Sequence, residues 1–223
     1  ALSLGVSTLD DYVDVKLACE PDTETLPGLL QPGAPEGLTF VSAHRLGPND
    51  PAISKVVDVA EYVAAIPWRW LRAQGMADVE AVRSYANDRV RAGLGPVVRP
   101  IDAVGKKVDV AKYVGLLAVG EGADAIEQAG YAGALCPVRM RVLVTPNGSA
   151  KAAEVVESIF GAECPARFVR TAMGTLRDGA VVLPTELEAL RAIRAEAKAV
   201  EDAARAEAKA REVVSMGEVT GEA

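Results

Sequence analysis

Residues 137–183 change their hydrophobic period within a short distance, and this change constrains the fold more than any other feature of the sequence. Every second residue from Val138 to Val144 is apolar, which is typical of a strand with one buried face. Asn147 and Gly148 then indicate a turn, and the apolar residues that follow recur at helical spacing. The expected elements, in order, are a strand over 138–144, a helix over 150–160, and strands over 165–171 and 179–183. Strand, helix and strand in succession predict an α+β or α/β fold.

The part of the chain before this unit is expected to be largely helical. Apolar residues recur three and four positions apart between Ile53 and Ala64. Pro67 suits the first turn of a helix, and Gly75 and Gly93 are natural helix ends. The expected helices cover 53–64, 68–74 and 78–92. Because aromatic residues make up only 4% of the chain, its core must consist mostly of Ala, Val and Leu.

The first 50 residues have the character of an extended acidic arm. They carry eight acidic and two basic side chains. Prolines and glycines crowd between Pro21 and Pro51, and each proline fixes φ and biases the preceding residue toward extended structure. Short strands are expected over 13–19 and 38–41, with little regular structure elsewhere. Asp10, Asp11 and Asp14 could hold a hard cation, but a solvated acidic surface explains the same cluster.

The end of the chain predicts one long helix. Thr185 and Glu188 form a capping-box signature, and neither Gly nor Pro follows until Gly217. Ten of residues 185–214 are alanine, which is the strongest helix former. We therefore expect a continuous helix over 185–214. Its apolar stripe begins with three large side chains that we expect at an interface: Leu187, Leu190 and Ile193.

Charge and cysteine usage limit the compartment and the partners. The net charge of −7 and the isoelectric point of about 4.9 argue against bulk affinity for nucleic acid or anionic lipid. Three widely spaced cysteines give no disulfide framework and favour a reducing compartment. No uncharged stretch is longer than 128–138, which is too short to cross a bilayer, and the N-terminus does not resemble a signal peptide. We expect a cytoplasmic protein, or one within an assembled particle, with neither nucleic-acid nor membrane partners.

Few residues in the sequence could support catalysis or metal binding. A nucleophilic thiol at Cys136 or Cys164 would need His44, the chain's single histidine, as its base. A zinc site lacks enough ligands, because there is no CxxC motif and no second histidine. We therefore expect no catalytic residue, no metal and no cofactor.

Asn147, Gly148 and Ser149 form the one weak candidate for a ligand site. If this turn feeds the N-terminus of the following helix, its backbone amides and the helix dipole would favour a phosphate or carboxylate. Neither the P-loop pattern nor GxGxxG is present. Helix capping by Asn147 or Ser149 explains the same residues without a ligand.

Both tryptophans of the chain lie in one short stretch, Trp68, Arg69, Trp70 and Arg72. Residues two apart on a helix do not share a face, so we expect one tryptophan in the core and the other at an interface, where Trp and Arg are typical anchors. Alternatively, Trp68 fills the core and Arg72 covers it by a cation–π contact. The sequence leaves both interpretations open.

These features predict an α+β (or α/β) protein with a strand-helix-strand core, an extended N-terminal arm and a long protruding C-terminal helix. Its expected parts are the acidic arm 1–50, a globular body 51–183, and the long helix with a short tail, 184–223. The leading functional hypothesis is a non-catalytic structural or assembly subunit of a virion or a multi-subunit cellular machine, with copies of itself as partners. The alternative is an α/β enzyme that binds a small molecule or phosphate through the turn at Asn147, Gly148 and Ser149.

Overall fold

The computed structural model describes the backbone of residues 5–100 and 105–218, and side chains as far as residue 207. The chain divides into two compact units. The first, called the body here, combines the segments 1–20 and 51–184. The second unit combines 21–50 with 185–223.

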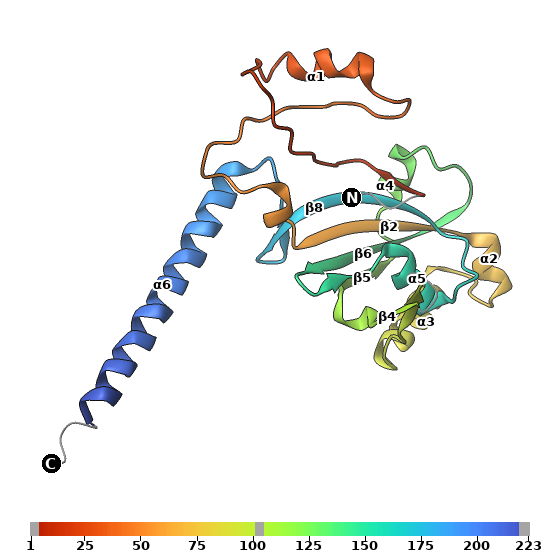
Figure 1. Ribbon diagram of the computed structural model, residues 1–223. Coiled ribbons are helices and arrows are strands. Elements are labelled where there is room, and N and C mark those ends of the chain that lie inside the picture. Colours follow the sequence, from red (N-terminus) through yellow and green to blue (C-terminus); the bar gives the residue numbers. More distant parts are fainter. Residues whose placement is uncertain (1–4, 101–104, 219–223) are drawn as a thin grey trace. The chain divides into compact units, whose positions relative to one another are not determined.

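A seven-stranded sheet forms the centre of the body (Figure 1). Its strands are β1 (Val6–Thr8), β2 (Val59–Pro67), β5 (Val114–Val119), β6 (Leu135–Thr145), β7 (Gly148–Ser149), β8 (Arg167–Arg177) and β9 (Ala180–Val182). The main order is β1-β8-β2-β6-β5, while β7 and β9 extend β6 and β8 as hairpin partners. β1 runs parallel to β8, and every other pairing in this sheet is antiparallel.

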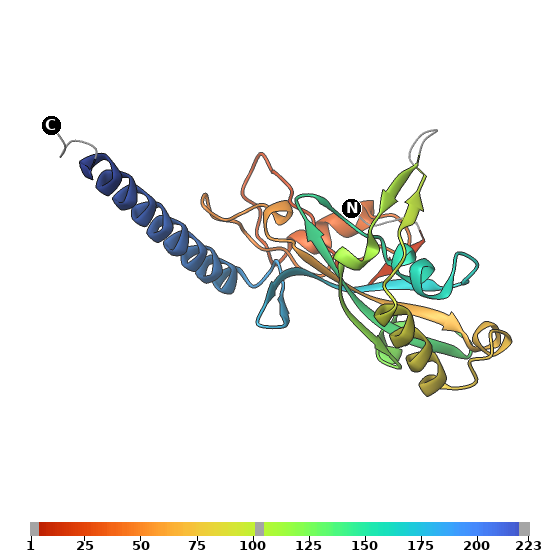
Figure 2. The same cartoon turned by 90° about the horizontal axis from the view of Figure 1, so that it is seen from below.

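The helices of the body alternate with these strands along the chain. They are α2 (Trp68–Ala73), α3 (Val79–Arg91), α4 (Ala123–Gln128) and α5 (Ala152–Phe160), with 3-10 turns at Ile53–Lys55 and Val110–Lys112. The succession β2-α3-β5-β6-α5-β8 with spatial order β8-β2-β6-β5 is the βαββαβ arrangement of ferredoxin-like folds. A separate two-stranded hairpin, β3 (Val97–Arg99) with β4 (Lys106–Val108), projects from the main sheet between α3 and β5 (Figure 2).

Apolar side chains fill both faces of the central strand β2. Ala64 and Ile66 belong to the larger cluster, which takes Val82 and Ala86 from α3 and Val155 and Ile159 from α5. On the other face, Val63 and Ala65 contact Ala125 and Ile126 of α4. Gly122 allows this close packing: its φ is +95°, and a Cβ there would overlap the side chain of Val63.

The sequence prediction of a mixed fold with a strand-helix-strand core is confirmed. The strand expected over 138–144 lies within β6, the helix over 150–160 contains α5, and the strands over 165–171 and 179–183 overlap β8 and β9. The helices expected over 68–74 and 78–92 correspond to α2 and α3. Asp78 caps α3 by accepting a hydrogen bond from the Ala81 amide at 2.9 Å.

The helix expected over 53–64 is wrong, because Val59–Pro67 forms the central strand β2. A strand covered on both faces needs apolar residues at successive positions, so the polar alternation that identifies a strand disappears. A continuous apolar run also satisfies helical spacing, and periodicity alone cannot separate the two.

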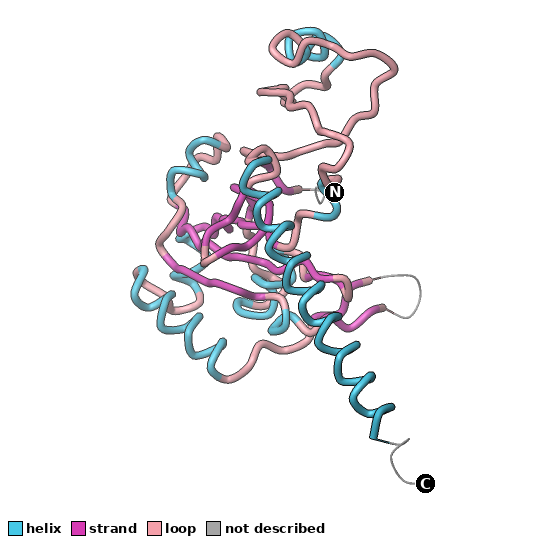
Figure 3. The backbone as a smooth tube through the Cα atoms, turned by 90° about the vertical axis from the view of Figure 1, so that its left-hand side faces the viewer, coloured by secondary structure: helices cyan, strands magenta, loops and turns pink. Residues whose placement is uncertain are grey.

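The second unit has little regular structure before its long helix. Its N-terminal part contains α1 (Leu26–Leu30) and a 3-10 turn at Gln31–Gly33, and no strand is assigned to 38–41. The other strand expected early in the chain, over 13–19, is not assigned in the body either. The expected long helix is α6 (Leu187–Glu218), which runs without interruption (Figure 3). Throughout the described part of the chain, no helix is both long and apolar enough to cross a membrane.

Candidate functional site

A group of charged side chains lies on the α4 side of the body's sheet. Glu61 of β2 is directly opposite Arg141 of β6, and Arg139 lies two residues along the same strand, so all three project from one face. Oε1 of Glu61 accepts hydrogen bonds from Nε and Nη2 of Arg141 at 2.9 and 2.6 Å. Oε2 accepts one from Nη2 of Arg139 at 2.9 Å. This cluster joins the two central strands through charge as well as through the backbone ladder.

Burial and hydrogen bonding shift the pKa of Glu61 in opposite directions. The residue is 7% exposed, and burial alone would raise the pKa of its carboxyl. The hydrogen bonds from Arg141 and Arg139 outweigh burial and hold this pKa below its ordinary value. The same contact with Glu61 raises the pKa of Arg139. Glu61 therefore stays ionised at neutral pH, which suits a structural ion pair rather than a proton-transfer group.

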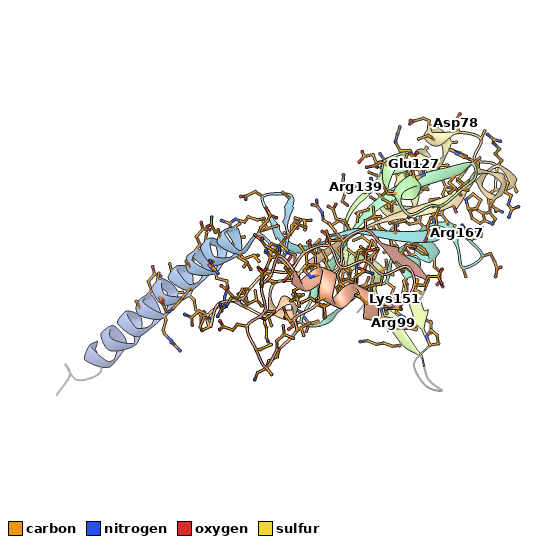
Figure 4. The ribbon with its side chains drawn as sticks, turned by 90° about the horizontal axis from the view of Figure 1, so that it is seen from above. Asp78, Arg99, Glu127, Arg139, Lys151 and Arg167 are labelled. Carbon is orange, nitrogen blue, oxygen red and sulfur yellow. The ribbon has the colours of Figure 1, made fainter. Side chains whose placement is uncertain are left out.

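A shallow pocket of about 300 Å³ opens beside this cluster. It is lined by Glu61, Val63, Glu121, Gly122, Asp124, Ala125, Arg139, Thr171 and Ala172. Arg139 spans its rim, because Nη1 lies 3.6 Å from the exposed carboxylate of Glu121. Figure 4 labels Arg139 of this pocket and Glu127 of α4. Within the described residues, no group of three or more His, Cys, Asp or Glu side chains could hold a metal ion.

A second pocket, of about 380 Å³, lies along α4 and the glycine-containing loop that follows it. Tyr131 contributes to its wall and is held firmly. Its hydroxyl is 2.8 Å from Oγ of Ser7 and donates to the carbonyl of Phe168 at 3.2 Å. The guanidinium of Arg167 lies 5.3 Å from the centre of the tyrosine ring. These contacts tie β1 to the sheet and engage the hydroxyl of Tyr131.

The turn at Asn147, Gly148 and Ser149 is not the N-terminus of a helix. It closes the β6–β7 hairpin, and α5 begins only at Ala152 with Lys151 as its cap residue. The expectation that Asn147 or Ser149 caps this helix is therefore wrong. The chain runs through β7 before it turns into α5, so the turn and the helix start are separated.

A carboxylate of the chain itself already occupies the start of α5. Oε2 of Glu154 accepts a hydrogen bond from the Lys151 amide at 2.8 Å. Arg99 holds the same carboxylate through Nε and Nη2 at 2.7 and 2.8 Å, and Nη2 also donates to the Ser149 carbonyl at 3.0 Å. Figure 4 shows Arg99 and Lys151 next to each other. Burial would raise the pKa of Glu154, but Arg99 and the Lys151 amide hold it below its ordinary value.

The thiols have no activating environment among the described contacts. Burial raises the pKa of both Cys136 and Cys164 to about 11, so both are neutral thiols at physiological pH. Cys19 is exposed. The Nε2 atom of His44 lies 3.4 Å from Oγ of Ser42 in the second unit.

The tryptophan stretch forms α2 and shows the cation–π contact of the second interpretation. Leu71 is fully buried, while Trp68 and Trp70 are half-buried and pack against the same core cluster. The guanidinium of Arg72 lies 5.9 Å from the Trp68 ring centre, as a cation–π contact requires, and Arg69 is exposed. An interface at this stretch stays a prediction.

In α6, the three residues predicted to lie at an interface differ in exposure. Leu190 is 3% exposed, whereas Leu187 and Ile193 are half-buried. Arg191 of the same helix forms two hydrogen bonds of 2.7 Å with the carboxylate of Asp50. Arg194 donates to the carbonyl of Asn49 at 3.0 Å. The first two turns of α6 therefore pack within the second unit itself.

Sequence reasoning missed the charged residues that the body buries. Besides the Glu61 cluster, Arg170 is 4% exposed and forms an ion pair with Asp11. Its Nε atom has no hydrogen-bond partner among the described residues. One signal was available: Arg139 and Arg141 occupy alternate positions of a strand, and a lone glutamate interrupts the apolar run at Glu61. Paired charges of opposite sign on neighbouring strands are favourable cross-strand partners.

Comparison with curated proteins and with solved structures returns no match. Residues 1–126, more than half of the chain, match a family model described as an uncharacterized protein conserved in bacteria (DUF2344). The match spans β1 to β5 and most of α4, and it includes Glu61 but not its partners Arg139 and Arg141. The chain belongs to this DUF2344 family of bacterial proteins.

Proposed function

We propose that this protein is a non-catalytic assembly subunit whose partners are copies of itself. The observation that carries the proposal is an extended segment of the body with an exposed apolar row. Val13, Val15 and Leu17 are 70%, 62% and 43% exposed. The backbone groups of residues 13–17 form no hydrogen bond with a backbone group in any described part of the chain. An extended chain with unpaired backbone groups and alternating apolar side chains is suited to pairing with another protein.

The anchoring of this segment supports the proposal. Asp11 forms an ion pair with the buried Arg170, and Asp14 accepts a hydrogen bond from the Ile53 amide at 2.8 Å. The body thus fixes the polar residues of the segment. The apolar row between and beyond them stays exposed, where burial of each valine by a partner would contribute roughly 1.5–3 kcal/mol.

The long helix is a second surface that a partner would stabilise. Every described side chain from Arg194 to Glu207 is exposed, including Val200 at 71%. Isolated helices are marginal in water, and packing supplies most helical stability in proteins. This agrees with a role in which the end of α6 is covered by other chains.

The alternative, a phosphate-binding or small-molecule enzyme using the turn at 147–149, has no observation in its favour. The turn closes a hairpin, and Glu154 occupies the neighbouring helix start. We therefore propose the assembly function and no enzymatic one.

Sedimentation velocity of the full chain over a range of concentrations tests the proposal. We expect association that weakens in Val13→Asp/Val15→Asp, because the two carboxylates would have to be buried in the interface. Val41→Asp is the matched control, since Val41 is 85% exposed outside the segment. A wild-type chain that stays monomeric at every concentration would overturn the proposed function.

A further inference from the structure

The exposed segment of the body at residues 13–17 has the sequence Val-Asp-Val-Lys-Leu. Side chains of an extended chain point alternately to opposite sides, so the apolar row shares one face while Asp14 and Lys16 share the other. All five residues are exposed. Lys16 forms no ion pair with any described residue. The segment thus presents one apolar face and one face that carries both signs of charge.

The body holds this segment in place without using its backbone. The last ladder bond before it runs from the Leu9 amide to the Arg170 carbonyl at 3.0 Å. The side chain of Asp11 then forms an ion pair with Arg170, and Asp14 accepts a hydrogen bond from the Ile53 amide at 2.8 Å. A segment that its own body already positions loses less conformational freedom on binding, which favours pairing with another chain.

Two copies of the segment are complementary to each other in one arrangement. In an antiparallel pair centred on Val15, this residue lies opposite Val15 of the second copy. Val13 then lies opposite Leu17, and Asp14 lies opposite Lys16, and both of these pairs occur twice. Apolar pairs and pairs of opposite charge are the favourable cross-strand combinations. Every side chain of the segment therefore meets a suitable partner.

The other ways of pairing most of the segment with itself are unfavourable. A parallel pair in register places Asp14 beside Asp14 and Lys16 beside Lys16. An antiparallel pair centred on either of these two residues also places like charges directly opposite, which is destabilising. A shift by one residue sets apolar side chains opposite charged ones. Charge and hydrophobicity together select the antiparallel register centred on Val15.

We propose that residues 13–17 of two copies pair as antiparallel strands about a twofold axis at Val15. This inference rests on the proposed function and adds the register and the symmetry of the contact. The paired backbones supply hydrogen bonds, and the two apolar rows bury each other's side chains in part. Because both copies use the same surface, the contact is isologous and closes after two subunits. Assembly beyond the dimer then needs another surface, such as the exposed part of α6.

Charge reversal followed by mixing tests the register. We expect Asp14→Lys and Lys16→Asp each to weaken self-association about tenfold in sedimentation velocity, because two opposite-charge pairs become like-charge pairs. An equimolar mixture of the two variants should associate again, because each reversed charge then faces its opposite. Asp14→Lys/Lys16→Asp should also associate better than Asp14→Lys, although both lack the contact with Ile53. Lys107→Asp reverses an exposed cation elsewhere in the body and is the matched control.

Cysteine cross-linking tests the symmetry, in a Cys19→Ser background that removes the exposed thiol. We expect Val15→Cys to form a disulfide-linked dimer under mild oxidation, because directly opposite Cβ atoms lie about 4.5–5.5 Å apart, close to disulfide reach. Val13→Cys is the control, since its opposite residue in the second copy is Leu17. It should cross-link far less.

Equal cross-linking of Val13→Cys and Val15→Cys, or association that ignores both charge reversals, would overturn the pairing. If the wild type still associates in either case, the proposed function stands and only the surface is wrong. Reversals that weaken association without recovery in the mixture would place the segment against a different surface of the second copy, and would also overturn self-pairing. A wild-type chain that stays monomeric at every concentration would overturn the proposed function and this inference together.

Discussion

The body and the second unit stabilise similar charged pairs in very different surroundings. In the body, Glu61 lies on β2, which has apolar side chains on both faces, and it binds Arg141 of the neighbouring strand β6. In the second unit, Arg191 holds Asp50 at the start of a helix where Leu190 is the one buried hydrophobic residue among those described. The body therefore has an extensive buried apolar core, and the described part of the second unit does not. The second unit depends on local hydrogen bonds and, in our account, on partner chains.

The largest effect is expected at the buried cluster of the body. Glu61→Ala should lower the free energy of unfolding by about 3–5 kcal/mol, because it leaves Arg141 and Arg139 beside an apolar core without their carboxylate. Urea denaturation measures this loss. Glu80→Ala is the control: Glu80 pairs with Arg83 on the surface of α3, where such a pair contributes about 0–1 kcal/mol. Equal losses in the two variants would contradict a structural role for the cluster.

The pH dependence of the same cluster follows from the lowered pKa of Glu61. A carboxyl whose pKa is lower in the folded state stabilises the fold above its unfolded value, here 4.5. That contribution is lost as pH falls through the folded pKa. Wild-type stability should therefore fall below about pH 4.5 more steeply than that of Glu61→Ala.

The tryptophans of α2 should each contribute less than the Glu61 cluster. Trp68→Ala and Trp70→Ala should each cost about 2–4 kcal/mol, somewhat below the value for a fully buried aromatic, because both rings are half-buried against one core. Arg69→Ala, an exposed neighbour, should change stability by less than about 0.5 kcal/mol. If one tryptophan variant unfolds like wild type but fails to assemble, that tryptophan is an interface anchor instead.

The ion pair that anchors the extended segment should have a smaller effect. Asp11→Ala should cost about 1–3 kcal/mol, because it leaves the buried Arg170 without a partner. Asp11→Ala/Arg170→Met should recover part of this loss, since no unpaired charge remains buried. Thermal unfolding of both variants decides: a double variant that is less stable than Asp11→Ala would contradict the argument.

The smallest effect on stability is expected in the second unit. Hydrogen bonds from Arg191 and from the Gly47 amide lower the pKa of Asp50 to about 2. Arg191→Ala should raise it toward the ordinary 3.8 while the unfolding midpoint of the body stays unchanged. NMR titration of the Asp50 carboxyl measures this shift, with Arg205→Ala as control. An unchanged Asp50 titration in Arg191→Ala would show that this pair does not persist in solution.

The two regions also differ in how far their structure could be predicted. Local patterns were sufficient to predict α3, with Gly93 as its end, and the uninterrupted helix α6. β2 could not be identified, because burial on both faces removes the alternation that distinguishes a strand. The Glu61 cluster depends on a register between strands about 80 residues apart, which no local pattern specifies. The hairpin at 97–108 was also missed, because each strand has only three residues.

Hydrogen exchange of the full chain at low and at high protein concentration tests the central claim most directly. We expect the amides of β2 and β6 to be protected at both concentrations, because the core of the body holds them. Residues 12–20 and 194–207 should exchange quickly when the protein is dilute and slowly when it is concentrated, because other copies then cover them. Identical exchange of these two segments at both concentrations would contradict the account of this protein as a self-assembling subunit.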